Sequence, residues 1–211
     1  MAEQSRKMQH LRRMADRVVL ITGGGGGIAQ GISRAFADEG ARLILTDLYP
    51  EGMEKTKKML EDDYGADVKN ALQAGIDRFG KINVIINNAQ ASASGKTLIE
   101  HSKEDFDIAI HSGLYAAFNY MKYGFPYLKE TEGSVINFAS GAGISGNPGQ
   151  SSYAAAKEGI RGLSRVAAAE WGPYNINVNV ICPLVMTDKL AVWGRENPEM
   201  FEKNLHSIPL G

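Results

Sequence analysis

The sequence feature that most constrains the fold is residues 18–31, VVLITGGGGGIAQG, where an apolar β-branched run meets five consecutive glycines and passes into a helical pattern. This order predicts a strand, a glycine-rich loop and a helix N-terminus. Glycines let backbone N–H groups approach a phosphate closely, and the first turn of a helix adds unpaired N–H groups and the positive end of its dipole. The stretch therefore predicts a site for the pyrophosphate of a dinucleotide, with a flexible glycine turn as the alternative.

Four further apolar runs follow, and the segments between them have helical patterns. The predicted strands are residues 18–22, 42–47, 82–87, 134–139 and 176–181. The predicted helices are residues 28–39, 51–64, 69–79, 103–128 and 152–171. Alternating strands and helices form parallel sheets covered on both faces, so we expect an α/β fold, a single Rossmann-type domain with a doubly wound parallel sheet. We place the domain at residues 17–211, after an N-terminal arm at residues 1–16 that has apolar residues on one helical face.

The composition argues against several classes of protein. A net charge of -1 over 211 residues leaves no basic excess for nucleic acid, and no apolar run is long enough to span a membrane. The single cysteine, Cys182, cannot form an intrachain disulfide, and we expect it to be a buried packing thiol. The N-terminus lacks the apolar core of a signal peptide, which favours a cytoplasmic protein. No metal site is expected, because no paired spacing joins His10, His101, His111 and His206.

An acidic residue ends the second predicted strand. Asp47 lies about twenty positions beyond the glycines, where a Rossmann unit accepts hydrogen bonds from the adenosine ribose hydroxyls. A carboxylate there repels a 2′-phosphate, so Asp47 predicts NAD(H) rather than NADP(H); ordinary turn chemistry at a strand end is the alternative. The next strand ends in Asn87, Asn88 and the small Ala89, where we expect the backbone to approach the cofactor.

Two side chains on the last predicted helix can act together. Tyr153 and Lys157 are four residues apart, so they lie on one helical face. An ammonium beside a phenol stabilises the phenolate and so favours proton exchange. The pair alone is a common accident on solvated helices, but Ser140 ends a strand at the edge where parallel sheets bind ligands. Together with the glycine loop, these residues predict a catalytic site.

The motifs occur in a recognisable order: TGGGGGIA at 22–29, NNAQ at 87–90, Ser140, and YAAAK at 153–157, with thirteen residues from the serine to the tyrosine. In this order and spacing the chain resembles the short-chain dehydrogenase/reductase family. The resemblance implies an NAD(H)-dependent oxidoreductase that interconverts a secondary alcohol and a ketone. It implies that Tyr153 exchanges a proton with the reacting oxygen, that Ser140 hydrogen-bonds this oxygen, and that Lys157 assists the tyrosine and holds the nicotinamide ribose. It also implies cofactor contacts at Gly23, Gly26, Gly27, Ile28, Asn88, Ala89, Pro183 and Thr187.

The chain also departs from the family pattern. Ala29 and Gln90 stand where the family has glycine, and Gly113 stands where it has an asparagine. His111 is two residues away, and the sequence leaves open whether His111, a backbone carbonyl or solvent supplies the missing function. The third strand and the last strand of the family sheet are short or missing, so both sheet edges are affected. Either the chain is a shortened variant or residues are omitted, and we expect omission, because exposed edges and apolar faces are unfavourable.

The resemblance over residues 106–187 is strongest to bacterial hydroxysteroid dehydrogenases, particularly the 20β type, which predicts a small alcohol or ketone substrate of the steroid class. Two alternatives remain: a reductase of a non-steroid ketone, and a dinucleotide-binding redox sensor without turnover. The family also implies a homodimer or homotetramer that pairs through the helices at 103–128 and 152–171. The run of three alanines at 167–169 permits close packing there.

Overall fold

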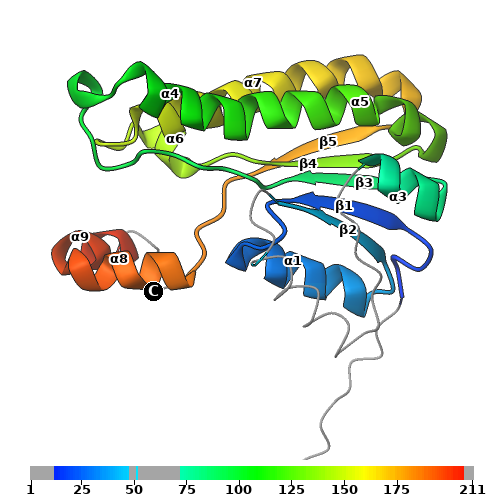
Figure 1. Ribbon diagram of the computed structural model, residues 1–211, viewed down its shortest axis with the longest axis horizontal. Coiled ribbons are helices and arrows are strands. Elements are labelled where there is room, and N and C mark those ends of the chain that lie inside the picture. Colours follow the sequence, from blue (N-terminus) through cyan, green and yellow to red (C-terminus); the bar gives the residue numbers. More distant parts are fainter. Residues whose placement is uncertain (1–11, 48–50, 52–71, 207–211) are drawn as a thin grey trace, which may run out of the picture.

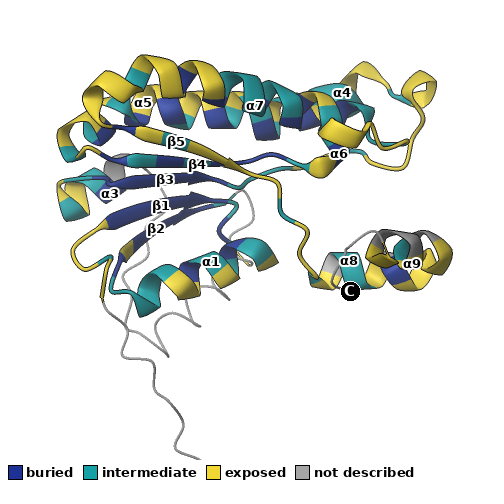
Figure 2. Cartoon of the chain, turned by 180° about the vertical axis from the view of Figure 1, so that it is seen from behind, coloured by how far each residue is buried: buried dark blue, intermediate teal, exposed yellow. Residues whose placement is uncertain are grey.

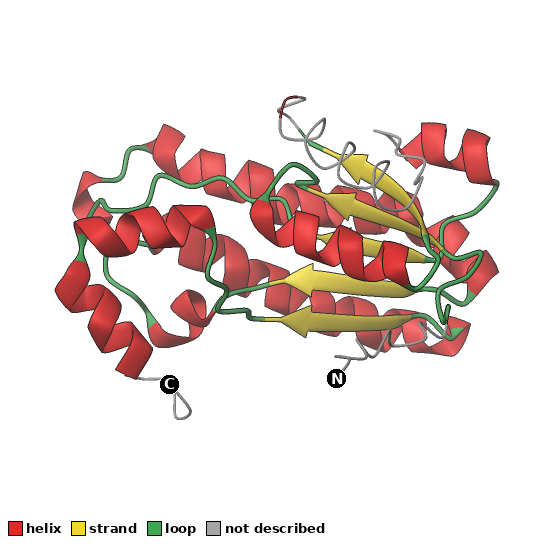
Figure 3. Ribbon diagram, turned by 90° about the horizontal axis from the view of Figure 1, so that it is seen from below, coloured by secondary structure: helices red, strands yellow, loops and turns green. Residues whose placement is uncertain are grey.

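The computed structural model describes residues 12–47, 51 and 72–206 of the chain. It contains one five-stranded sheet in the order β2-β1-β3-β4-β5, in which every neighbouring pair is parallel (Figure 3). The strands are β1 (Val18–Thr22), β2 (Arg42–Thr46), β3 (Val84–Asn87), β4 (Ser134–Phe138) and β5 (Asn177–Ile181). All five begin and end within two residues of the predicted bounds, so the predicted Rossmann-like parallel sheet is confirmed.

The helices follow the predicted alternation. They are α1 (Gly27–Asp38), α3 (Leu72–Phe79), α4 (Lys103–Ala109), α5 (Ala116–Thr131), α6 (Gly141–Ser145), α7 (Ser151–Trp171), α8 (Asp188–Glu196) and α9 (Pro198–His206). The helix predicted at 103–128 is divided, because Ile110–Tyr115 forms a π-helical turn between α4 and α5. The predicted helix at 51–64 and the short strand candidate at 65–68 lie outside the described residues, apart from residue 51. None of the described helices is long and apolar enough to cross a membrane.

Two apolar layers hold the sheet between helices (Figure 1). Side chains of β1 alternate between them: Val19 and Ile21 pack toward α1, whereas Val18 and Leu20 pack toward α3, α5 and α7. All four side chains are fully buried. This alternation follows from the period of two along a strand, and it explains why a central parallel strand is a continuous apolar run.

The order of strand connections reverses at β1. The chain passes from β1 to β2 on one side and then returns to place β3 on the other side, with Leu20 paired to Ile44 and to Ile85. The carboxyl ends of β1 and β3 therefore border a topological switch point, where the loops diverge and a ligand can enter. The glycine loop follows β1, and residues 88–90 follow β3, so the predicted binding residues lie at this point.

Among the described residues, β2 and β5 are the outer strands of the sheet. Most of β5 is exposed, including the apolar Val180 and Ile181 (Figure 2). The prediction for Cys182 is wrong: this thiol is exposed, because it directly follows the outer strand β5 and does not lie in the core.

The described part of the N-terminal arm forms a turn rather than a helix. Met14 packs against the core layer beneath α1, and its backbone N–H donates to the Glu39 carbonyl at 3.0 Å. The Arg13 guanidinium pairs with the Glu39 carboxylate at 2.7 Å. These contacts fasten residues 12–16 to the end of α1, whereas residues 1–11 lie outside the described part of the chain.

Candidate active site

The glycine loop after β1 leaves no room for side chains. Gly23 has a φ of 68°, and a Cβ there would lie 3.0 Å from the Ala89 Cα. A Cβ on Gly24 would lie 2.7 Å from the Leu45 Cβ, which is closer than real contacts allow. Gly26 caps α1 without a side-chain hydrogen bond, so the first N–H groups of this helix face outward from a bare backbone. The loop has the form of a phosphate cradle, in which any Cβ would take the space of the ligand or of a neighbouring strand.

A single threonine joins the loops at the switch point. The Thr22 Oγ1 accepts hydrogen bonds from the backbone N–H groups of Asn88 and Ala89, both at 3.0 Å. The Asn88 side chain donates back to the Thr22 carbonyl at 3.0 Å. These bonds fix the end of β3 against the first glycine of the cradle. Asn88 and Ala89 therefore lie beside the glycine loop, where the sequence placed them.

The other predicted cofactor residues approach the same loop. The Asp47 carboxylate, at the end of β2, accepts a hydrogen bond from the Gly25 N–H at 3.0 Å. Thr187, in the segment that begins at Pro183 after β5, places its Cγ2 4.0 Å from the position of a Cβ on Gly27. Ile28 follows in the first turn of α1 and packs against the core. The structure thus brings together glycines, an acidic strand end and the 183–187 segment, a set that fits a dinucleotide.

The three predicted catalytic residues lie just beyond the end of β4 and on α7. Ser140 is two residues beyond β4, and its Oγ accepts from the Ala142 N–H at 3.1 Å at the start of α6. Tyr153 and Lys157 lie one turn apart on α7, with the Lys157 Nζ 5.5 Å from the centre of the Tyr153 ring. The Lys157 Nζ donates to the Phe138 carbonyl at 2.8 Å, which fixes the ammonium beneath the end of β4.

Lys157 is an unusually buried cation, with 3% of its surface exposed. Loss of water around the ammonium disfavours the charged form and lowers the pKa of Lys157 to about 8. Buried lysines with lowered pKa values are concentrated at functional sites, where the cation acts on another group. Here the neighbouring group is Tyr153.

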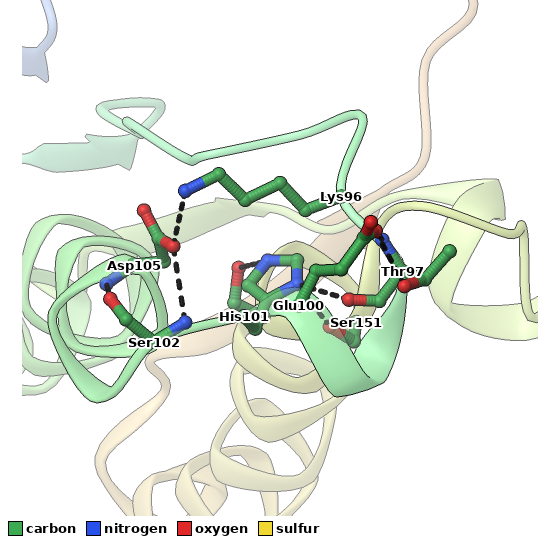
Figure 4. A network of polar contacts seen from close by, with 8 residues as sticks. Lys96, Thr97, Glu100, His101, Ser102, Asp105 and Ser151 are labelled. Atoms are coloured by element: carbon green, nitrogen blue, oxygen red, sulfur yellow. Dashed lines mark hydrogen bonds and ion pairs between the residues drawn. The ribbon is translucent and has the colours of Figure 1, made fainter.

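A histidine that the sequence did not single out holds the start of α7 (Figure 4). The His101 Nδ1 lies 3.1 Å from the Thr97 carbonyl, which can only accept, so Nδ1 carries the proton. Nδ1 is also 3.1 Å from the Ser151 Oγ, and Nε2 is 3.2 Å from the Ser152 Oγ. His101 therefore links the segment around 97–101 to the two residues that precede Tyr153. No motif marks this role, because the partners are fifty residues apart in the chain.

Charged side chains make further contacts within the same segment (Figure 4). Hydrogen bonds from Thr97 hold the pKa of the Glu100 carboxyl below its usual value. A hydrogen bond from Lys96 lowers the pKa of the Asp105 carboxyl in the same way, and Asp105 also caps α4 at Ser102. These pairs connect the loop between β3 and α4 to the first turn of α4.

His111 does not occupy the position of the missing asparagine. Its ring is exposed and stacks on Tyr115 at 5.1 Å, whereas Gly113 is buried. The side chain that lies against Gly113 is Gln90, whose Oε1 would be 2.1 Å from a Cβ there. Gln90 and Gly113 are separate departures from the family pattern in the sequence, and nothing in the sequence indicates that they are in contact.

Comparison with known proteins agrees with this geometry. Residues 17–197 match the family model for short chain dehydrogenase. The chain belongs to the short-chain dehydrogenase family. It is 54% identical to 12α-hydroxysteroid dehydrogenase of a Clostridium species, over 92% of this chain and 83% of that protein. The family is one of NAD(P)-dependent oxidoreductases, so this chain is an oxidoreductase of that family.

Two solved structures of the family are also similar. Levodione reductase is 36% identical with a TM-score of 0.77, over 81% of this chain and 72% of that one. NAD⁺-bound xylitol dehydrogenase is 27% identical with a TM-score of 0.77, over 81% and 71%. The comparisons do not support the predicted 20β class, because the hydroxysteroid dehydrogenase that the chain resembles is of the 12α type. The 20β prediction rested on overall similarity around residues 106–187, which no single side chain ties to one steroid position.

Proposed function

We propose that this protein is an NAD(H)-dependent hydroxysteroid dehydrogenase that interconverts a 12α-hydroxyl group and the ketone. The observation that carries the oxidoreductase chemistry is the buried Lys157 ammonium, fixed by the Phe138 carbonyl one helical turn from Tyr153. The steroid position comes from the 54% identical relative, whose name gives its substrate class.

The side chains divide the chemistry in the following way. Tyr153 exchanges a proton with the reacting oxygen, because its ring lies beside the Lys157 ammonium, 5.5 Å from the Nζ. The positive charge of Lys157 stabilises the phenolate, and its fixed position adds no reorganisation cost. Ser140 donates a hydrogen bond to the same oxygen from the end of β4. Nicotinamide, when bound, supplies or accepts the hydride.

The cradle residues hold the cofactor without side-chain chemistry. The N–H groups at the start of α1 would hold the pyrophosphate, and Asp47 would accept hydrogen bonds from the adenosine ribose. Asp47 lies close enough to the cradle to bond the Gly25 N–H, so a 2′-phosphate placed beside it would face a carboxylate. This geometry supports NAD(H) over NADP(H). The similarity to a dehydrogenase solved with NAD⁺ supports the same choice.

Apolar side chains near the carboxyl edge of the sheet support a steroid as substrate. Leu98 and Ile99, after β3, are 72% and 94% exposed. Ile144 in α6 and the segment Leu184–Met186 after β5 are also exposed. The Gly95 N–H donates to the Gly149 carbonyl at 2.8 Å, so the loops that carry Ile99 and Ile144 are joined. Exposed apolar groups gathered at a ligand-binding edge favour a large apolar substrate.

A reductase of a smaller cyclic ketone is the second candidate, favoured by the 36% identity to levodione reductase. The redox-sensor alternative is weaker, because a sensor without turnover needs neither Tyr153 nor a buried cation beside it. The two enzymatic functions differ in the substrate that is reduced at the expense of NADH, and the sensor consumes no NADH.

The deciding experiment follows NADH absorbance with the purified protein against a substrate panel. The panel contains steroids with the oxygen at the 3, 7, 12 or 20 position, and a set of small cyclic ketones. We expect turnover at the 12 position at least about tenfold above the others, because an oxygen at another position leaves the polar groups of the site unpaired. Equal turnover of all steroids, or faster turnover of the small ketones, contradicts the 12α proposal. Absence of turnover with bound NADH supports the sensor.

A further inference from the structure

Two departures from the family pattern, Gln90 and Gly113, lie in contact, and the Gln90 side chain fills the space that a side chain at residue 113 would need. Gly113 is buried within the π turn, and a Cβ there would be 2.1 Å from the Gln90 Oε1 and 2.8 Å from its Cδ. A side chain at residue 113 and the Gln90 amide therefore exclude each other. The glycine costs helix stability, about 1 kcal/mol relative to alanine, so a specific reason for it is expected.

Hydrogen bonds fix the Gln90 amide in this place. Its Nε2 donates to the Ala91 carbonyl at 2.7 Å and to the Ala109 carbonyl at 3.1 Å. Both partners are acceptors, so the orientation of the amide is determined. The neighbouring Ala91 N–H donates to the Ser112 Oγ at 2.9 Å, and the Ser112 hydroxyl contacts the Ile108 carbonyl at 2.7 Å. The loop after β3 is thereby joined to the π turn at two adjacent points.

The π turn contacts the helix that carries the candidate catalytic pair. A π turn contains one extra residue, which leaves backbone carbonyls without their regular helical partners. Gln90 donates a hydrogen bond to the carbonyl of Ala109, the residue that immediately precedes this turn. On the other side, Leu114 packs against Gly159, with its Cδ2 2.8 Å from the position of a Cβ there. Gly159 is two residues beyond Lys157, so a shift of the π turn moves the α7 segment that carries Lys157.

We propose that Gln90 is a positioning residue of the active site. Its amide occupies the place of a side chain at residue 113, gives the Ala109 carbonyl a donor, and fixes the π turn against α7. Gln90 and Gly113 then form a coupled pair, in which each residue is acceptable only with the other. The inference uses the proposed function only for the turnover assay below.

The test exchanges the two side chains separately and together. Gly113→Asn introduces a Cβ against the Gln90 amide, and Gln90→Gly removes the amide and its hydrogen bonds. We expect each single variant to lower the urea midpoint by about 0.5–1 M and kcat by about tenfold. The double variant Gln90→Gly/Gly113→Asn supplies an amide from residue 113 in place of the one removed at residue 90. We expect its kcat to return to within about threefold of the wild-type value and its urea midpoint to recover most of the loss seen in the single variants. The KM for cofactor should stay nearly constant in all variants.

Controls separate this coupling from general damage. Gly172→Asn makes the same change at the C-cap of α7, where the backbone is right-handed helical and nothing lies within 4 Å of the Cβ, and we expect no change in midpoint or kcat. Gln90→Glu keeps the size of the side chain but lacks the donor to Ala109, and we expect it to lower kcat as Gln90→Gly does. Wild-type kcat in Gln90→Glu, or a double variant whose losses equal the sum of the single ones, overturns the proposal.

The unfolding measurements need no substrate, so they test the pair even if the function proposed above is wrong. Turnover is measured with the panel member that the wild-type protein converts fastest. If no steroid is converted but the unfolding midpoints show the coupling, the 12α proposal fails and the coupled pair stands. If a steroid is converted and the coupling is absent from both readouts, the coupled pair fails alone.

Discussion

The buried ammonium of Lys157 makes a quantitative prediction about stability and pH. Burial lowers its pKa from 10.5 to about 8, and this difference corresponds to a cost of about 3 kcal/mol for burying the charge in the folded protein. Lys157→Met removes this cost but leaves the Phe138 carbonyl without its donor, which costs about 1–3 kcal/mol. At pH 7 the variant should therefore be as stable as the wild type or more stable, although it has lost a residue of the candidate site.

The sign of the pH dependence follows from proton counting. Between pH 8 and 10.5 the folded protein has lost the Lys157 proton while the unfolded chain still holds it. Wild-type stability relative to the variant should therefore rise across this window, by up to about 1.4 kcal/mol per pH unit and about 3 kcal/mol in total. Below pH 8 the difference should be flat. Other groups titrate in both proteins and cancel in the comparison.

The assay is urea denaturation of the cofactor-free proteins from pH 7 to 10.5, followed by circular dichroism. Lys129→Met removes an exposed lysine, whose ammonium lies over the Tyr174 ring, and is the control for deleting a lysine from the surface. A difference between wild type and Lys157→Met that stays constant over the whole range would refute the reasoning. The same pH dependence in both variants would refute it as well, because burial would then have no part in the effect.

Three further predictions concern cofactor choice, catalysis and assembly. Asp47→Ala should reduce the preference for NADH over NADPH by about tenfold or more, since the carboxylate that would repel the 2′-phosphate of NADPH is removed. Steady-state kinetics with both cofactors measure this preference. A wild-type preference for NADPH would contradict the role of Asp47. Tyr153→Phe should lower kcat by about a thousandfold while NADH binding, measured by fluorescence titration, stays within about threefold, because the ring remains and only the proton-exchanging hydroxyl is lost. Substantial turnover in this variant would contradict the acid/base role. Phe118 and Val166 are exposed on α5 and α7, so we propose that they pair with a second copy, and Val166→Lys should convert a dimer or tetramer to a smaller species by light scattering. A wild-type monomer at micromolar concentration would contradict the pairing.

The structure changes the part of the assembly prediction that rests on the three alanines of α7. The alanines at 167–169 were expected to face a partner, but Ala167 is buried in the core layer beneath α7. Only Ala168 and Ala169 are exposed. A run of small residues indicates close packing, and its position around the helix decides whether the packing is internal.

Much of the fold was available from the sequence because its signals are local. The strands were predicted within two residues, since apolar β-branched runs bounded by glycine, proline and polar residues require only short-range information. The glycine cradle was predicted because five glycines stand between an apolar run and a helical pattern, and the structure gives the reason for two of them: a positive φ at Gly23 and no space for a Cβ at Gly24. Tyr153 and Lys157 were placed together because helix geometry fixes residues four apart on one face.

Tertiary structure decided the features that depend on how distant segments pack. The sequence separates His101 from Ser151 by fifty residues, and only the packing of the 97–101 loop on α7 brings them within 3.1 Å. The exposure of Cys182 follows from its place beyond the outer strand β5, which no apolar pattern reveals. In the sequence, Gln90 and Gly113 are two unconnected departures from the family pattern. Their contact exists because the end of β3 and the π turn meet at the same edge of the sheet, and distances between such segments are set by the whole fold.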